Sequence, residues 1–164
     1  MNDSEINRLF PGVDPGTIHY LRVLSAFHEG VTITDAQGTV LYMNEAQAKI
    51  DDLNIEKSIG KKITTLYSLD EGQSPTIACL NTGKAISNLP SFYRTHLGRV
   101  VNSIHNIYPI TANNKLIGTI CYITDFRNIE HTFDTVMQAQ PPHSRPNGVA
   151  DKHQNGTRFT FRDI

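Results

Sequence analysis

Apolar and polar residues alternate along two short stretches, 30–35 and 39–43, which the turn residues 36–38 separate. Alternation with a period of two is typical of half-buried β-strands, and a short glycine-containing turn joins antiparallel neighbours. Asn44 follows the second stretch as a favourable N-cap, and Gln47 is placed to complete a capping box. The pattern therefore predicts a β-hairpin that leads directly into a helix.

The residues before this hairpin predict an amphipathic helix. Asp14 followed by Pro15 is a favourable helix start, and Gly30 ends the pattern. Between them Ile18, Leu21, Leu24 and His28 recur at helical spacing. We expect a helix over 15–27 within an N-terminal segment that comprises residues 1–29.

The middle and the end of the chain predict helices and then strands. Between Asp51 and Lys84, Gly60 and Gly72 interrupt the helical pattern. The expected helices there are a short one over 63–67 and one that Ser74 caps, that Pro75 opens and that Gly83 ends. Three strands follow, over 85–94, 99–110 and 115–124, with turns at 97–98 and 112–114. Two strands, several helices and three strands predict an α+β fold, in which a five-stranded antiparallel sheet carries the helices on one face.

An apolar stripe follows the last predicted strand. Phe126, Ile129, Phe133 and Val136 recur every three or four residues, which predicts an exit helix over 128–140. Two heptads are short for an isolated coiled coil, so this helix either pairs with a second copy or packs on its own domain. Pro, Asn, Gly, Gln and His then dominate residues 141–158, a composition typical of a linker.

Composition and charge narrow the function. The 164 residues include 15 basic and 16 acidic ones, and no basic stripe gathers on one element, so we expect no nucleic-acid binding by this segment itself. No apolar run approaches the length of a membrane span and residues 1–10 are polar, which favours the cytoplasm. Cys79 and Cys121 are too few for a disulfide framework and are expected to be buried thiols.

Four local motifs resemble those of PAS domains. They are the first hairpin at 30–38, the strand-to-helix junction at 40–46, Ile59-Gly60-Lys61 before the short central helix, and the last strand with its terminal Asp and Arg at 118–127. The resemblance covers residues 30–127. It implies a sensory domain with a helical insert on one face of the sheet and with flanking N- and C-terminal helices.

The end of the sequence resembles part of another domain. Residues 157–164, Thr-Arg-Phe-Thr-Phe-Arg-Asp-Ile, are similar to the entry into the central ATPase of sigma-54-dependent transcriptional activators. The whole layout, including Tyr108-Pro109-Ile110, is most similar to the sensory domains of arginine-utilisation regulators in that group. The resemblance implies that residues 141–164 are a linker and the start of an AAA+ ATPase domain. It also implies that the full-length protein binds DNA and sigma-54 RNA polymerase.

The resemblance also indicates where an effector binds. PAS effectors lie between the helical insert and the sheet, and the polar candidates there are Tyr42, Asn44, Tyr93, Asn102, Asn106 and Tyr122. Both faces of the fourth strand mix polar with apolar residues, and we expect the row of Asn102 and Asn106 to point inward. Backbone groups or water can satisfy the same side chains, and Asn44 can act solely as a helix cap. Asp125 and Arg127 are expected to form an ion pair that couples the sheet to the exit helix.

Cofactors and catalysis find little support in the sequence. The helix over 75–82 lacks the histidine of haem-binding PAS domains, and Cys79 lacks the flavin-adduct motif of light sensors. The seven histidines show no metal-ligand spacing and are expected on the surface or in the linker, and no Walker loop or catalytic set is present. We therefore expect a non-enzymatic, homodimeric sensor without cofactor or metal, whose effector is a small metabolite such as an amino acid. The alternatives are a constitutive dimerisation module with a self-filled interior and a histidine-kinase input domain, against which residues 159–164 argue.

Overall fold

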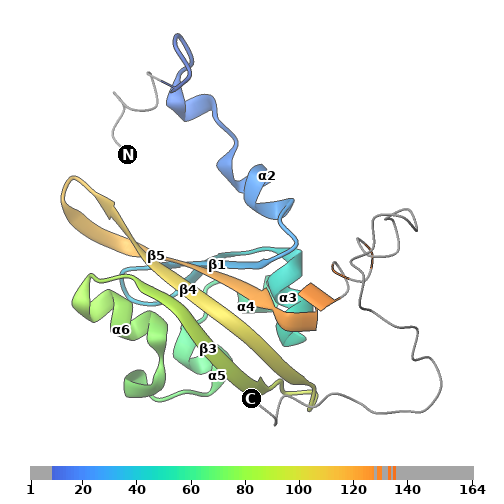
Figure 1. Ribbon diagram of the computed structural model, residues 1–164. Helices are drawn as coiled ribbons and strands as arrows, with labels where there is room; N and C mark the ends of the chain where they lie inside the picture. The colour runs from blue at the N-terminus through green and yellow to red at the C-terminus, as the bar shows by residue number, and fades with distance from the viewer. Residues whose placement is uncertain (1–8, 128, 131–132, 134, 136–164) are drawn as a thin grey trace, which may run out of the picture. The chain divides into compact units, whose positions relative to one another are not determined.

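The computed structural model describes residues 9–127, 129–130, 133 and 135 (Figure 1). The chain divides into two units, 1–129 and 130–164. In the second unit the described residues are Glu130, Phe133 and Thr135, all in helical conformation. The predicted exit helix over 128–140 therefore lies largely, and the predicted linker over 141–164 entirely, outside the described residues.

Five antiparallel strands form the sheet in the first unit, in the order β2-β1-β5-β4-β3. This order places the first and last strands side by side in the middle of the sheet and leaves β2 and β3 at its edges. The bounds agree with the predicted strands to within two residues, and the predicted α+β fold is confirmed. The strands are β1 Gly30–Asp35, β2 Val40–Met43, β3 Ile86–Arg94, β4 Val100–Ala112 and β5 Lys115–Asp125.

The helices of the insert connect β2 to β3 and lie on one face of the sheet (Figure 1). Asn44 caps the first helix by accepting a hydrogen bond from the Gln47 backbone amide, as predicted. Ser74 caps the last helix, and Gly83 ends it with a φ of 65°. Two short elements, α4 and η2, were not predicted. The insert comprises α3 Glu45–Asp51, α4 Ile55–Ser58, α5 Ile63–Tyr67, η2 Glu71–Gln73 and α6 Pro75–Thr82.

One face of the sheet is buried beneath this insert. Along β4 the fully buried positions are Val101, Ser103 and Ile107, and the last two pair with Asp125 and Cys121 of β5. Residues paired in an antiparallel ladder share a face, so these positions form one inner row that crosses the sheet. The apolar part of the core lies on this face and comprises Ile50, Cys79, Val101, Ile107, Cys121 and Ile123.

The N-terminal segment differs from its predicted form. A 3-10 turn at Pro15–Thr17 and the helix α2 at Tyr20–Ser25 replace the single helix expected over 15–27. None of the α2 residues is buried, and Leu21 and Val23 are each more than half exposed. Helices this short depend on tertiary packing for their stability, and α2 receives little packing from its own domain.

We expect Gly118 to be intolerant of any side chain. A Cβ atom at this position in β5 would lie 2.0 Å from the backbone oxygen of Thr34 in β1. Because the obstructing atom belongs to the backbone, Gly118→Ala must separate two central strands, and it should lower the free energy of unfolding by roughly 2 kcal/mol or more. Urea denaturation measures this loss. Gly72→Ala is the control, since nothing lies within 4 Å of its added Cβ, and equal midpoints for the two variants would contradict the close approach of β1 and β5.

Candidate functional site

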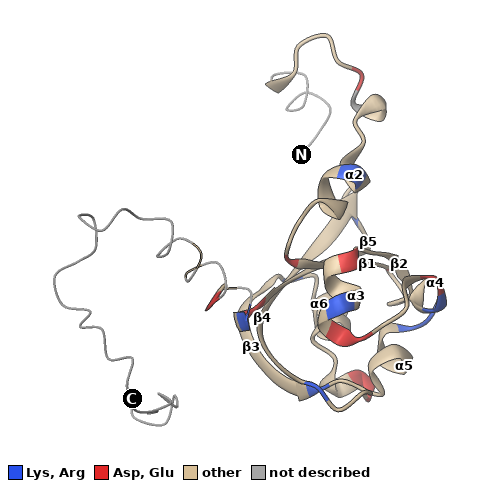
Figure 2. Ribbon diagram, turned by 90° about the vertical axis from the view of Figure 1, so that its right-hand side faces the viewer, with Lys and Arg blue, Asp and Glu red and all other residues tan. Residues whose placement is uncertain are grey.

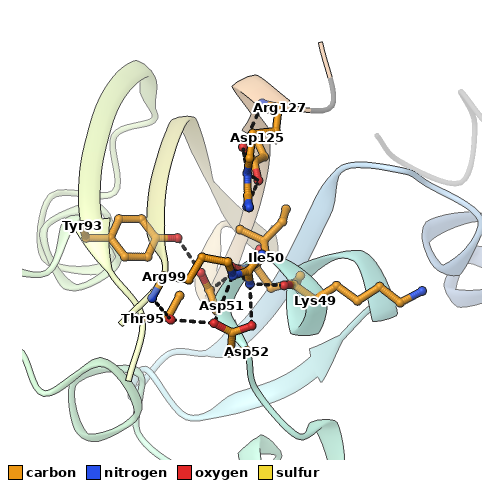
Figure 3. A network of polar contacts seen from close by, with 10 residues as sticks. Lys49, Ile50, Asp51, Asp52, Tyr93, Thr95, Arg99, Asp125 and Arg127 are labelled. Atoms are coloured by element: carbon orange, nitrogen blue, oxygen red, sulfur yellow. Dashed lines mark hydrogen bonds and ion pairs between the residues drawn. The ribbon is translucent and has the colours of Figure 1, made fainter. Parts of the chain in front are cut away.

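A buried carboxylate occupies the interior between the insert and the sheet. Asp51 is the last residue of α3 and is only 3% exposed. The hydroxyl of Tyr93 donates a hydrogen bond of 2.5 Å to its Oδ1 atom (Figure 3). The hydroxyl of Tyr67 and the Nε2 group of Gln47 both donate to its Oδ2 atom. Asp51 thus serves as an acceptor in all three contacts, which is the pattern of an ionised carboxylate.

The surroundings of Asp51 control its charge and that of its partners. Burial raises the pKa of Asp51, while the hydrogen bonds from Tyr67, Tyr93 and Gln47 and the nearby charge of Arg99 oppose the increase. Burial and the Asp51 charge raise the pKa of both Tyr67 and Tyr93, so the two phenols remain protonated donors. All three groups that donate to the carboxylate are therefore neutral.

Arg99 fixes the end of α3 that carries Asp51. Its guanidinium binds both oxygens of Asp52 at 2.7 and 3.1 Å and donates to the backbone oxygens of Ile50, at 2.6 Å, and Lys49 (Figure 3). Thr95 donates a further hydrogen bond of 2.6 Å to Asp52. A helix leaves its last carbonyl groups without intrahelical partners, and here Arg99 supplies them. This Arg99 clamp ties the α3 end to the turn between β3 and β4.

Two buried polar atoms on the inner side of the domain have no hydrogen-bond partner among the described residues. They are the side-chain oxygens of Gln47 and Thr32. The Gln47 oxygen lies over Gly30, where a Cβ atom would come within 2.3 Å of it. Thr32 is next along the same face of β1 and pairs with Cys121, whose pKa burial and the Asp51 charge raise to about 12. We call Thr32, Gln47, Asp51, Tyr67 and Tyr93 the Asp51 cluster.

The cluster crosses the sheet from β1, which carries Thr32, to the edge strand β3, which carries Tyr93. The inward positions of the edge strand β3 are Leu89, Ser91 and Tyr93, and all three are half-buried. Ser103, which pairs with Ser91 from β4, is fully buried. Burial thus decreases toward β3, the edge strand that carries Tyr93.

Only one of the six predicted ligand contacts has its polar group in this interior. Tyr93 does, through its bond to Asp51. Asn44 is buried but acts as a structural cap: its Oδ1 atom accepts hydrogen bonds from the backbone amides of Val31 and Gln47. Its amide group donates to the backbone oxygens of Leu24 and Glu29.

The expectation that the row of Asn102 and Asn106 points inward is wrong. Asn102 is exposed, and the Asn106 side chain accepts a hydrogen bond from the exposed backbone of Asn88. Tyr122 pairs with Asn106 and so shares its outer face, as does Tyr42, whose hydroxyl donates to the Leu21 backbone oxygen at 3.4 Å. The inner row carries Ser103 and His105 instead. Hydrogen bonding and packing satisfy the polar groups of Ser103 and His105 in the interior. The polarity of a side chain therefore did not indicate which face of β4 it occupies.

The sequence interpretation missed most of the Asp51 cluster. Gln47 was assigned to a capping box, but its side chain turns inward to Asp51. One signal was available, since positions 47 and 51 are four apart and share the helix face next to Ile50. Tyr67 and Thr32 carried no comparable signal, because their proximity to Asp51 arises only when the insert folds over the sheet.

The predicted ion pair at the end of β5 is present. Arg127 binds the Asp125 carboxylate at 2.5 Å and also donates its backbone amide to it at 3.0 Å. Asp125 is buried in the same inner row as Ser103, whereas Arg127 is exposed. The pair therefore connects the inner face of the sheet to the residues that follow it (Figure 3).

His105 is the histidine of the inner row, contrary to the expected surface or linker positions. Its ring packs edge-on against Tyr93, with 6.1 Å between centroids, and shares a hydrogen bond of 3.0 Å with Ser103. Burial lowers the pKa of His105 to about 4. The ring is therefore neutral at pH 7 and supplies no positive charge to the interior.

Among the residues that the structure describes, the charged side chains outside this interior do not gather into a site. Acidic and basic positions are interspersed along the helices and turns (Figure 2). Within the described part of the chain, no group of three potential ligands is arranged to hold a metal ion. No helix among the described residues has the length and apolar character needed to cross a membrane.

Comparison with known proteins identifies a relative in sequence. No family model matches the chain. It is 21% identical over 159 residues to the transcriptional activator RocR of Bacillus subtilis. The alignment covers 88% of this chain and 33% of RocR, so the chain spans about a third of the length of that relative.

Solved structures of PAS domains resemble this chain. A PAS domain from a Colwellia psychrerythraea protein superposes with a TM-score of 0.55 at 15% identity, covering 65% of this chain and 92% of that domain. A PAS domain from a two-component sensor histidine kinase gives 0.52 at 11% identity, covering 74% of this chain and 98% of the other. Identities this low establish a common fold and leave the activity open.

We predict that His105 makes the protein sensitive to acid. The histidine has a pKa of about 4 when folded and 6.5 when unfolded, so the unfolded state takes up the proton first. Its contribution to stability is complete above pH 6.5 and is lost as the pH falls toward 4, with a loss of roughly 2 kcal/mol at pH 5. His105→Gln should remove this loss, which urea unfolding at pH 7.5 and 5.0 measures.

The matched control for this prediction is His96→Gln, at an exposed position in the turn between β3 and β4. The raised pKa of Asp51 works in the opposite direction, because a buried carboxyl gains stability as the pH falls, but that contribution is common to all three proteins. Equal acid sensitivity of the wild type and His105→Gln would show that His105 is not buried as the structure places it.

Proposed function

We propose that this chain, which has the fold of PAS domains and is related in sequence to a transcriptional activator, senses a small metabolite and controls an ATPase domain that follows it. The Asp51 cluster is the observation that carries the proposal. The metabolite binds between the insert and the sheet, at this cluster. Residues 157–164, with their resemblance to the entry of a sigma-54-activator ATPase, motivate the downstream domain.

The energetics of the interior support a binding role. Taking a carboxylate out of water costs several kcal/mol, and apolar replacement of buried ionic groups is often neutral or stabilising. Two unpartnered oxygens, on Gln47 and Thr32, add a further cost of about 1–3 kcal/mol each. A domain whose interior only had to pack would not need these groups. A ligand that satisfies them recovers the cost on binding.

The ion pair at the end of β5 provides a route for the signal. Asp125 belongs to the inner row that the ligand would face, and Arg127 leads into the predicted exit helix. A ligand shifts such a junction only by its different affinity for the two arrangements. In the full-length protein this shift would act on the ATPase, with DNA and sigma-54 RNA polymerase as partners and the cytoplasm as location.

Exposed apolar residues favour a second candidate, a constitutive homodimerisation module. Leu21 and Val23 of α2 are uncovered, and Phe92 on the outer face of β3 is 75% exposed. Exposed apolar side chains of this kind are typical of association surfaces. The sensor proposal also includes a homodimer, so the presence of a ligand distinguishes the two. A histidine-kinase input domain is the third candidate, against which residues 159–164 argue.

The sensor proposal predicts a ligand that saturates. The chain, purified under native conditions, should release a small compound on denaturation, which mass spectrometry identifies, and adding that compound to emptied protein should raise the melting temperature with saturable dose dependence. Asn102→Ala, on the outer face of β4, should respond like the wild type. An empty protein that no amino acid or related metabolite stabilises would instead favour the dimerisation module.

The homodimer is tested separately by sedimentation. Phe92→Glu places a charge on the outer face of the sheet. Because Phe92 is exposed, the substitution should leave the fold intact. It should convert a dimer to a monomer at micromolar concentration. Leu97→Glu is the matched control, since Leu97 is 72% exposed but lies in the turn between β3 and β4. A wild-type protein that sediments as a monomer, or a Phe92→Glu protein that stays dimeric, would exclude this interface.

A further inference from the structure

Most of the hydrogen-bonding groups that remain unused in the Asp51 cluster are acceptors. Tyr67 and Tyr93 each have one hydroxyl proton, and both protons are used on Asp51. Gln47 also directs its amide group to Asp51, which leaves its oxygen free, and the Thr32 hydroxyl oxygen has no partner. The cluster therefore presents mainly lone pairs to a ligand: the Gln47 amide group is used on Asp51 and Tyr67, and the Thr32 hydroxyl is a donor as well as an acceptor.

The charge of the cluster is negative, which suits the same kind of ligand as its free acceptors. In the described part of the chain, the groups that hydrogen-bond to Asp51 are all neutral. Arg99 is a nearby cation, and its Nε and Nη2 groups bind Asp52 and the carbonyl groups at the end of α3. His105 faces the same interior as a neutral ring. Asp51 is thus a buried negative charge without a bonded counter-ion.

We propose that the Asp51 cluster binds the cationic head group of a small organic ligand, such as a primary ammonium, amidinium or guanidinium group. Asp51 is the counter-ion, and the oxygens of Gln47 and Thr32 accept further N–H groups from the cation. This inference rests on the proposed sensory function and specifies its ligand. A carboxylate or phosphate at the same place would meet a negative charge and mainly acceptors, so the cluster repels anionic head groups.

The edge of the sheet determines how such a ligand lies. Leu89 and Ser91 are the half-buried inward residues of β3 beyond Tyr93. With its cationic group at Asp51, the rest of the ligand extends past these residues toward solvent. Polar groups at the far end of the ligand therefore stay hydrated, and the site selects mainly by the head group.

The test compares four probes that share a chain and differ in head group: butylammonium, butylguanidinium, butyramide and butyrate. Melting temperature and NMR titration of the 164-residue chain measure their binding. We expect both cations to stabilise the protein saturably, and butyramide and butyrate to have no effect. Asp51→Asn, which keeps the shape and removes the charge, should lower cation affinity by about tenfold or more. Glu45→Gln, at an exposed acid of α3, is the matched control.

Thr32→Val keeps the test decisive if Asp51→Asn does not fold. It removes a hydroxyl that has no partner at nearly constant volume, so the variant should fold at least as stably as the wild type while cation affinity falls about threefold to tenfold. Equal cation binding by the wild type and Thr32→Val would overturn the assignment of this site.

The remaining outcomes separate this inference from the sensory function. Stabilisation by butyrate or butyramide that survives in Asp51→Asn would overturn the cationic head group and leave a small-molecule sensor. If the four probes fail but the native protein releases a compound, a cationic compound supports the inference and an anionic or neutral one overturns it. Failure of all four probes with no released compound overturns both proposals.

Discussion

A carboxylate at the C-terminal end of a helix meets the negative end of the helix dipole, and Asp51 does so inside the core. The Asp51 carboxylate and the negative end of the helix dipole repel each other in this poorly hydrated interior, so their arrangement needs a restraint. The Arg99 clamp provides that restraint, because one guanidinium binds the last carbonyl groups of α3 and the Asp52 carboxylate together. The position of α3 over the sheet, and hence of Asp51 relative to its donors, depends on this contact between the first helix of the insert and the turn that starts β4.

Asn44 performs a comparable task at the other end of α3. A single amide group connects β1, the start of α3 and the N-terminal segment through four hydrogen bonds to backbone groups. Side chains therefore anchor both ends of this helix, and its inward residues Gln47 and Asp51 are held in register with the sheet. The interior can keep polar groups whose burial costs free energy, because contacts outside the interior already fix both ends of α3.

The sequence was sufficient for the fold because each element carried its own local signal. The hairpin turn, the Asn44 and Ser74 caps and the Gly83 helix end all depend on neighbours within a few residues, and the four PAS-like motifs agree with the fold of the solved PAS domains. The site depends on contacts that are distant in sequence. Tyr93 meets Asp51 across 42 positions, and nothing local to either residue indicates that meeting.

The sequence also did not show which face of β4 points inward. Alternation correctly separates two rows, but the choice between them rests on which polar side chains find partners. Ser103 and His105 satisfy each other in the interior, while Asn106 binds the backbone of the edge strand outside. The alternation thus gave the two-residue period of β4, but it could not show which of the two rows faces the interior. The 15–27 segment was mispredicted for a related reason, since its apolar spacing does not reveal whether a surface exists to receive it.

The placement of the first and last strands has a mechanical consequence. Gly30, where β1 begins, pairs with Ile123 near the end of β5, so the chain enters and leaves the sheet at neighbouring points. Tension transmitted through the two flanking segments would load the β1–β5 ladder one pair at a time from this end, as in opening a zipper, instead of shearing all its bonds together. The pairs that open first lie beside the Asn44 cap and the Asp125–Arg127 ion pair. The domain is accordingly easiest to deform at the point where both flanking segments attach, and it resists deformation most at the far end of the sheet.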